Sequence, residues 1–167
     1  MNLKLVFLFI VSALSMARPV DLPKVRTAYI EAADSEAATK TLHEELMSVS
    51  KTDDKTLVAY KGAVTTMMAK YAKGIKEKKN YFKEGAELLE YALEAKPKSV
   101  EIRCIRLSVQ ENVPKITGYT KNIEEDKQFI LDNFNSVSNK NSKDFVKGYI
   151  SKSEIFSESE RQLLQDS

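Results

Sequence analysis

Residues 55–97 decide the fold, and they read KTLVAYKGAVTTMMAKYAKGIKEKKNYFKEGAELLEYALEAKP. The stretch has no proline before Pro97, and alanine, lysine, glutamate, leucine and methionine dominate it, which favours helix. Apolar residues recur in its first half at steps of three and four, which predicts one narrow apolar stripe. They are Leu57, Tyr60, Val64, Met67, Met68, Tyr71 and Ile75. A second helix is expected from about Asn80 to Lys96, so the two helices predict an antiparallel hairpin.

The second helix of this hairpin resembles the second helix of a tetratricopeptide repeat. Such a helix carries an aromatic residue, a small residue, a large residue, an alanine and a closing proline at fixed spacings. The matching residues are Phe82, Gly85, Leu89, Ala92, Leu93 and Pro97. The first helix departs from the repeat pattern, and no second copy follows about thirty-four residues away. The resemblance covers one repeat and implies a divergent helical-repeat relative.

A second resemblance covers residues 97–130. Three segments carry it, Ser99–Ser108, Gln110–Pro114 and Gly118–Lys127. Together they resemble a group of uncharacterised secreted bacterial helical proteins. That resemblance implies a periplasmic or extracellular bacterial setting, and it brings no activity, cofactor or site with it.

The N-terminus has the pattern of a cleavable secretory signal peptide, residues 1–17. Met1–Lys4 supply one positive charge, Leu5–Met16 are almost wholly apolar, and small residues lead up to Ala17. The apolar run is shorter than the roughly twenty residues of a membrane span. We therefore expect cleavage near Ala17, a periplasmic or extracellular location, and no transmembrane segment in the mature chain.

The charge balance and the cysteine count exclude several classes of partner and cross-link. Removing Lys4 with the signal leaves 25 basic residues against 24 acidic ones, so overall charge gives no case for binding nucleic acid or an anionic membrane. Cys104 is the single cysteine, so no internal disulfide can form. It lies in an apolar stretch, where we expect a buried, unreactive thiol.

Helices are also expected on both sides of the hairpin. Asp21 and Ser35 are candidate caps of two helices before it, with one helix bent near Asp34 as the alternative. Asn122, with Glu125 as its reciprocal partner, is expected to cap a helix whose buried face carries residues up to Phe134. The other members of that face are Ile123, Phe129 and Ile130.

The chain divides into a helical domain, residues 18–134, and a partly flexible tail, residues 135–167. In the tail, a polar connection from Asn135 to Ser142 precedes two short helices, Lys143–Ile150 and Glu158–Gln165, the second with Ser157 and Glu160 at capping-box spacing.

The helix from about Ser99 to Val113 is expected to lie between two layers. At 100° per residue it has one apolar side with Ile102, Ile105, Val109 and Val113 and an opposite one with Val100, Cys104 and Leu107. Two polar stripes separate these sides, one with Arg103, Arg106 and Gln110 and the other with Glu101, Ser108 and Asn112. The sequence therefore predicts an all-α fold of about six helices, either a layered antiparallel bundle or a short TPR-like α-solenoid.

The first polar stripe is the best candidate binding surface. Arg103 and Arg106, flanked by Gln110, suit a carboxylate or phosphate, because each guanidinium presents a planar fork of donors. Tyr119, in the loop that follows, is a further candidate anchor. The alternative is structural: the arginines pair with carboxylates of the hairpin or of residues 124–126 and fix helix packing.

Catalytic and metal-binding templates do not fit. His43-Glu44-Glu45 begins like a zinc-protease helix, but Met47 stands where the second histidine would be, and His43 is the single histidine. Ser48 and Lys51 have the spacing of a serine activated by lysine, without the companion motifs. The sequence therefore indicates no catalytic residue, no metal site and no cofactor.

A lysine-rich stretch within the hairpin allows two interpretations. Its members are Lys70, Lys73, Lys76, Lys78 and Lys79. They could dock an acidic partner or a lipid headgroup, or they could form a solvated face that the glutamates of the following helix neutralise.

The function expected from these features is a non-enzymatic protein- or ligand-binding module. A groove between the helix at residues 99–113 and its neighbours would accept a protein segment, a peptide or an acidic ligand. The alternative is a small envelope-acting hydrolase that uses paired carboxylates, which are plentiful in the sequence.

Overall fold

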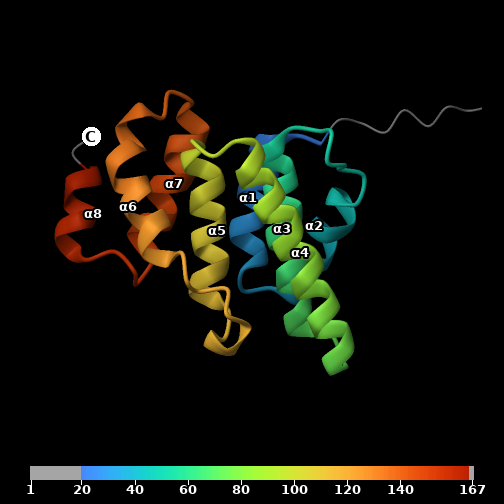
Figure 1. The fold of residues 1–167 in the computed structure, drawn as a ribbon. Helices are drawn as coiled ribbons and strands as arrows, with labels where there is room; N and C mark the ends of the chain where they lie inside the picture. Colours follow the sequence, from blue (N-terminus) through green and yellow to red (C-terminus); the bar gives the residue numbers. More distant parts are fainter. Residues whose placement is uncertain (1–19, 166–167) are drawn as a thin grey trace, which may run out of the picture.

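The computed structural model describes residues 20–165, which form an all-α fold in layers (Figure 1). The fold class predicted from the sequence is confirmed, with eight α-helices in the described chain where about six were expected. They are α1 (Leu22–Ala32), α2 (Glu36–Leu46), α3 (Lys55–Tyr71), α4 (Ile75–Ala95), α5 (Val100–Asn112), α6 (Ile123–Asn133), α7 (Lys140–Lys152) and α8 (Glu158–Gln165). Two short 3-10 helices, η1 (Lys115–Thr117) and η2 (Phe134–Ser136), lie between them. The expected signal peptide, residues 1–17, lies outside the described residues.

The hairpin of α3 and α4 forms as predicted, although α4 begins at Ile75 instead of near Asn80. The two helices come very close where Gly62 of α3 faces Gly85 of α4. A β-carbon added to Gly62 would lie 2.7 Å from the carbonyl oxygen of Gly85 and 2.8 Å from the amide nitrogen of Leu89. Only glycine fits this crossing, because the neighbouring helix presents backbone there.

The apolar stripe predicted for the first hairpin helix is wrong in its extent. From Thr56 to Thr66, α3 is buried all the way round except at Lys61. The reason is that α3 packs against α1, α2, α4 and α5 together, so that a helix with many small residues fills the middle of the N-terminal layers. Ile75, expected on that stripe, instead starts α4 and is exposed.

Helix α5 lies between two layers, as its two apolar faces predicted. On one side it packs against α3 and α4, and on the other against α6 and α7 (Figure 1). Ser99 caps it by accepting a hydrogen bond from the amide of Ile102 at 3.2 Å. Cys104 in its centre is fully buried and has a free thiol.

A buried ion pair joins the first helix to this central one. The guanidinium of Arg26 in α1 donates two hydrogen bonds to Glu101 in α5, at 2.8 and 2.9 Å. Tyr60 of α3 donates a third to the same carboxylate at 3.0 Å. Because all three side chains are buried, the network fixes how α1, α3 and α5 sit against each other.

The predicted helix caps differ in outcome at the beginning of the chain. Ser35 caps α2 by accepting a hydrogen bond from the amide of Ala38 at 3.2 Å, as expected. Asp21 precedes α1 but accepts no capping hydrogen bond through its side chain. Proline in the opening turn explains part of this, because Pro23 has no amide hydrogen to donate.

The capping box predicted for α6 does not form. The side chain of Asn122 accepts no capping hydrogen bond, and its side-chain nitrogen Nδ2 donates instead to Glu125 at 2.9 Å. The other oxygen of Glu125 accepts a hydrogen bond from Arg103, so α5 holds this carboxylate away from the backbone of Asn122.

The C-terminal helices pack onto the same core. Helix α7 begins at Lys140, three residues before the expected start, because Asn139 caps it through the amide of Ser142. Ser157 and Glu160 form the predicted capping box at α8, with bonds of 3.3 and 2.7 Å. Phe145 and Phe156 join the core. Among residues 20–165, none of the helices has the length and hydropathy that crossing a membrane requires.

Candidate binding groove

Arg106, one of the residues proposed for binding, is buried in an ion-pair cluster. Its Nε and Nη2 donate to the two carboxylate oxygens of Asp126 in α6, at 2.6 and 2.7 Å. Its Nη1 donates to Glu90 in α4 at 2.9 Å. Burial alone would lower the pKa of Arg106, but the hydrogen bonds and charge of Asp126 outweigh it and raise the pKa. The guanidinium is therefore always charged and fully engaged inside the protein.

Arg103 belongs to the same cluster. Its Nη1 donates to Asp126 at 2.8 Å and to Glu125 at 2.9 Å, and its guanidinium stacks 4.2 Å from the ring centre of Phe129. The pairing with residues 124–126 that the sequence offered as the structural alternative is what the geometry shows. Both arginines join α5 to its neighbours.

Gln110 and Tyr119, the other two proposed residues, are held by contacts within the protein and do not line the groove described below. Tyr119 donates to Glu90 at 2.5 Å, and its ring meets that of Phe82 edge-on, 5.7 Å between centres. Gln110 is 1% exposed, and neither its amide nitrogen nor its oxygen has a hydrogen-bond partner among the described residues. The four proposed residues therefore do not line a common cavity.

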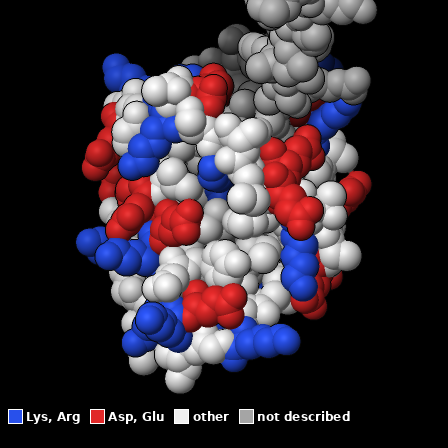
Figure 2. All heavy atoms as spheres, turned by 90° about the vertical axis from the view of Figure 1, so that its right-hand side faces the viewer, with Lys and Arg blue, Asp and Glu red and all other residues white. Residues whose placement is uncertain are grey.

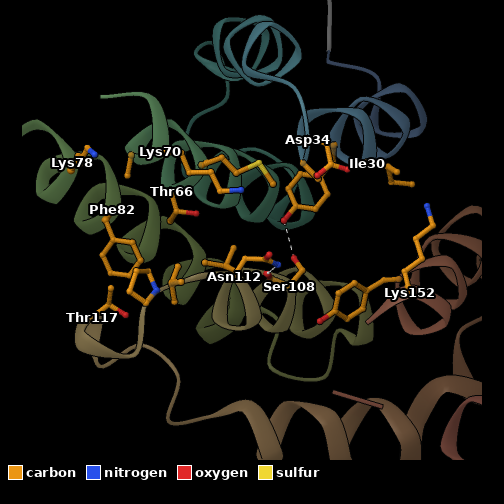
Figure 3. Close-up of a pocket in the computed structure, with 18 of the residues that line it drawn as sticks. Ile30, Asp34, Thr66, Lys70, Lys78, Phe82, Ser108, Asn112, Thr117 and Lys152 are labelled. Carbon is orange, nitrogen blue, oxygen red and sulfur yellow. Dashed lines mark hydrogen bonds between the residues drawn. The ribbon is translucent and has the colours of Figure 1, made fainter. Parts of the chain in front are cut away.

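A large groove lies on the other side of α5 (Figure 3). It has a volume of about 960 Å³, and residues from α1, α3, α4, α5, η1 and α7 line it. Most of the lining is apolar or aromatic, and these lining residues are Tyr29, Ile30, Ala33, Met67, Ala69, Phe82, Val109, Val113, Pro114, Ile116, Phe145 and Tyr149. The size and the apolar character match the concave sites that hold small molecules.

Few uncharged polar groups face the groove. The hydroxyl of Tyr29 lies 2.8 Å from that of Ser108, and Ser108 in turn donates to the carbonyl of Ile105 at 2.7 Å. Since the proton of Ser108 is used there, Tyr29 is the donor of the pair. Burial raises the pKa of Tyr29, so its hydroxyl stays neutral. Asn112 lies beside Ser108, and Thr66 lies farther along the groove, toward Phe82 (Figure 3).

Lysines stand at both ends of the groove. Lys70 and Lys78 lie on the side formed by α3 and α4, and Lys152 lies at the end formed by α1 and α7 (Figure 3). Lys79, next to Lys78 in α4, also lines the groove. Asp34 is the one carboxylate among the described lining residues. All four lysines are exposed, and none has an ion-pair partner in residues 20–165. Asp34 follows α1 and offsets the charge of Lys152 at that end, so the net positive charge of the rim lies at the end formed by α3 and α4. An apolar floor beside this positive end suits a ligand with an apolar body and an acidic group.

The binding residues predicted on α5 lie on a different stripe of the helix from the one that faces the groove. Ser108 and Asn112, on the stripe opposite the arginines, face the groove, and part of the lysine-rich stretch forms its rim. The walls could not be found from a local pattern, because Tyr29 and Tyr149 are 120 residues apart. The polar stripe of α5 that carries Ser108 and Asn112 was the one signal in the sequence that could have indicated the groove.

The residues tested against catalytic templates lie outside the groove. His43 is half-buried and meets the ring of Tyr81, 6.0 Å between centres, and burial lowers its pKa. Ser48 donates to the carbonyl of Glu45, while Lys51 stacks on Tyr91. Within residues 20–165, no group of three histidine, cysteine or acidic side chains is placed to bind a metal.

Comparison with known protein families, with curated proteins and with solved structures finds no match to this chain.

Proposed function

We propose that this protein is a secreted or periplasmic, non-enzymatic binding module that holds an acidic ligand with an apolar body in the groove beside α5. The observation that carries the proposal is the groove itself, about 960 Å³ with a mainly apolar lining and lysines at both ends. Burying an apolar body contributes about 25 cal/mol for each Å² removed from water. The lysines add selectivity for an anion, because they attract it from the edge without being buried themselves.

The binding surface of this proposal differs from the one centred on the arginines. Arg103 and Arg106 already bind Asp126, Glu125 and Glu90 of the same chain, and Asp126, which both arginines share, is fully buried, so a ligand that took both arginines would have to displace it. Displacing a buried carboxylate costs several kcal/mol. The groove requires no such exchange. A small carboxylic acid and a peptide that presents apolar side chains beside a carboxylate both meet its description.

The alternative of a paired-carboxylate hydrolase has no comparable support. Such enzymes need two carboxyl groups about 5 to 10 Å apart on either side of the substrate. Asp34 has no second carboxylate facing it among the described residues that line the groove.

The test uses a fluorescent fatty acid, dansyl-undecanoic acid, and its methyl ester. The chain contains no tryptophan, so dansyl emission can be followed without background from indole. We expect saturable binding of the acid with a blue-shifted emission and weaker binding of the uncharged ester. Equal affinity for the two probes would contradict the role of the lysines.

Gly148 of α7 offers a matched pair of variants. It lines the groove, and a β-carbon added there would meet no atom within 4 Å. Gly148→Phe should fill the groove and weaken binding of the acid about tenfold or more, which is about 1.4 kcal/mol. Gly148→Ala adds one methyl group and should bind nearly as the wild type does. If Gly148→Phe folds and binds the probe normally, the ligand does not occupy this groove.

A further inference from the structure

One end of the molecule has a strong local positive charge, which the small net charge of the whole chain does not reveal. Residues 69–80 and 114–118, the tip of the α3–α4 hairpin and the neighbouring η1 loop, contain six lysines and one glutamate, Glu77. The lysines are Lys70, Lys73, Lys76, Lys78, Lys79 and Lys115. All six are exposed, and their ammonium groups have no ion-pair partner within the described chain. The tip therefore carries a formal excess of five positive charges, although the whole chain carries only two.

Two isoleucines project from the same end. Ile75, the first residue of α4, is 76% exposed, and Ile116 in η1 is 95% exposed. Ile75 shares a face of α4 with Lys78, Lys79 and Phe82, which line the groove together with Ile116. Figure 2 shows blue side chains around a pale lower tip, with red ones few in number there. A single exposed apolar side chain is ordinary on a protein surface, so these two isoleucines are informative only because lysines surround them.

We propose that this basic tip, defined by the six lysines with Ile75 and Ile116, docks on an anionic phospholipid surface. Lysines near such a surface are attracted by its negative potential, and isolated apolar side chains between them can insert at the level of the headgroups. The charge balance of the whole chain gave no case for membrane binding, but a bilayer meets only one end of the molecule. The local excess decides the interaction, because charges more than about 10 Å away are screened.

The arrangement fits a membrane better than an acidic protein. A protein partner needs a continuous patch, with about 800 Å² buried on each side. Here the two isoleucines stand on separate segments, one at a helix start and one in a 3-10 turn, with lysines around them. A fluid headgroup layer can accommodate separate apolar side chains of this kind, whereas a fixed protein surface would need a matching contact for each one.

The experiment is sedimentation of the signal-free protein with vesicles of phosphatidylglycerol and phosphatidylcholine. We expect partitioning onto vesicles rich in phosphatidylglycerol and none onto pure phosphatidylcholine. The triple variant Lys73→Gln/Lys76→Gln/Lys115→Gln should lower the partition coefficient about a hundredfold, because each lysine contributes about fivefold. None of these three residues lines the groove, so binding of dansyl-undecanoic acid should not change.

Matched control variants distinguish the effect of charge at the tip from the effect of the net charge of the protein. The triple variant Lys24→Gln/Lys40→Gln/Lys140→Gln removes the same charge from exposed positions outside the tip and should change vesicle binding by less than about threefold. Ile75→Ser should weaken it, whereas Met47→Ser, at another exposed apolar position, should not.

Three results would overturn the proposal. The first is absence of binding to vesicles that contain phosphatidylglycerol. The second is equal loss in the two lysine triple variants, which would mean adsorption by net charge alone, or no loss from Ile75→Ser, which would mean that this isoleucine does not insert. The third is capture of the tip by soluble polyglutamate in preference to vesicles, which would assign it to an acidic macromolecule instead.

Discussion

The crossing of α3 and α4 predicts opposite effects for the same substitution at two helical glycines. Alanine is favoured over glycine inside a helix by about 1 kcal/mol. At Gly148 the new methyl group meets nothing within 4 Å, so Gly148→Ala should raise the free energy of unfolding by about 0.5 to 1 kcal/mol. At Gly85 the β-carbon would lie 2.6 Å from both the amide nitrogen and the Cγ2 of Thr66, and it would also clash with the carbonyl oxygen of Gly62.

The clash at Gly85 should outweigh the gain in helix propensity. Two of the three contacts are with backbone of α3, which cannot move aside without separating the helices. Overpacking of this kind costs about 1 to 3 kcal/mol, and contacts with backbone belong at the upper end. Subtracting about 1 kcal/mol of propensity leaves a net loss of about 2 kcal/mol for Gly85→Ala.

Urea denaturation followed by circular dichroism at 222 nm measures both variants. With a slope of about 2 kcal/mol/M, the midpoint should fall by about 1 M for Gly85→Ala and rise by up to about 0.5 M for Gly148→Ala. Gly62→Ala should behave as Gly85→Ala does, because its β-carbon would meet backbone of α4. A Gly85→Ala protein as stable as the wild type would refute the close crossing.

Three further predictions concern buried and charged groups. Asp126→Ala should lower the free energy of unfolding by about 3 to 5 kcal/mol in the same urea assay, because it leaves two arginines without their shared carboxylate. Glu124→Ala, at an exposed position in the same helix, should lower it by less than about 0.5 kcal/mol. Burial raises the pKa of the Cys104 thiol well above its usual value, so Ellman's reagent should modify the native protein only as it unfolds; rapid labelling without urea would contradict this. Hydrogen bonds from Arg103 lower the pKa of Glu125 in the folded protein. The stabilisation by Glu125 is therefore present above the ordinary glutamate pKa of about 4.3 and is lost as the pH falls through the lower pKa of the folded state. The difference in unfolding free energy between wild type and Glu125→Gln should shrink from about pH 5 to about pH 3.

Local signals in the sequence were sufficient for most of the helices. Breakers and caps such as Ser35 and Pro97 act within a few residues, so their effect can be predicted without knowing the fold. The two apolar sides of α5 also predicted its position between two layers of helices. The extent of burial of α3 could not be predicted in this way, because small residues such as Gly62 and Ala63 carry little hydrophobic signal and reveal nothing about how many neighbours surround them.

The candidate site depended on long-range contacts, and the sequence left it open. Arg103 and Arg106 could have faced a ligand or internal carboxylates, and the choice depends on where α6 places Asp126. The groove depends on the approach of α1 and α7 to the same side of α5, which no single segment encodes. The likeness of one hairpin helix to a tetratricopeptide repeat stays a prediction.

The ion pair between Arg26 and Glu101 has a consequence for the order of folding. The two residues are 75 positions apart, whereas the α3–α4 hairpin closes within a continuous stretch of some forty residues. Because short loops close at lower entropic cost, the hairpin can form while α1 is still undocked. A buried arginine without its carboxylate is strongly unfavourable, so α1 gains a stable place only after α5 has joined the hairpin. Helix α1 is therefore expected to be among the last of the described helices to reach its native position, although α3, α4 and α5 all follow it in the sequence.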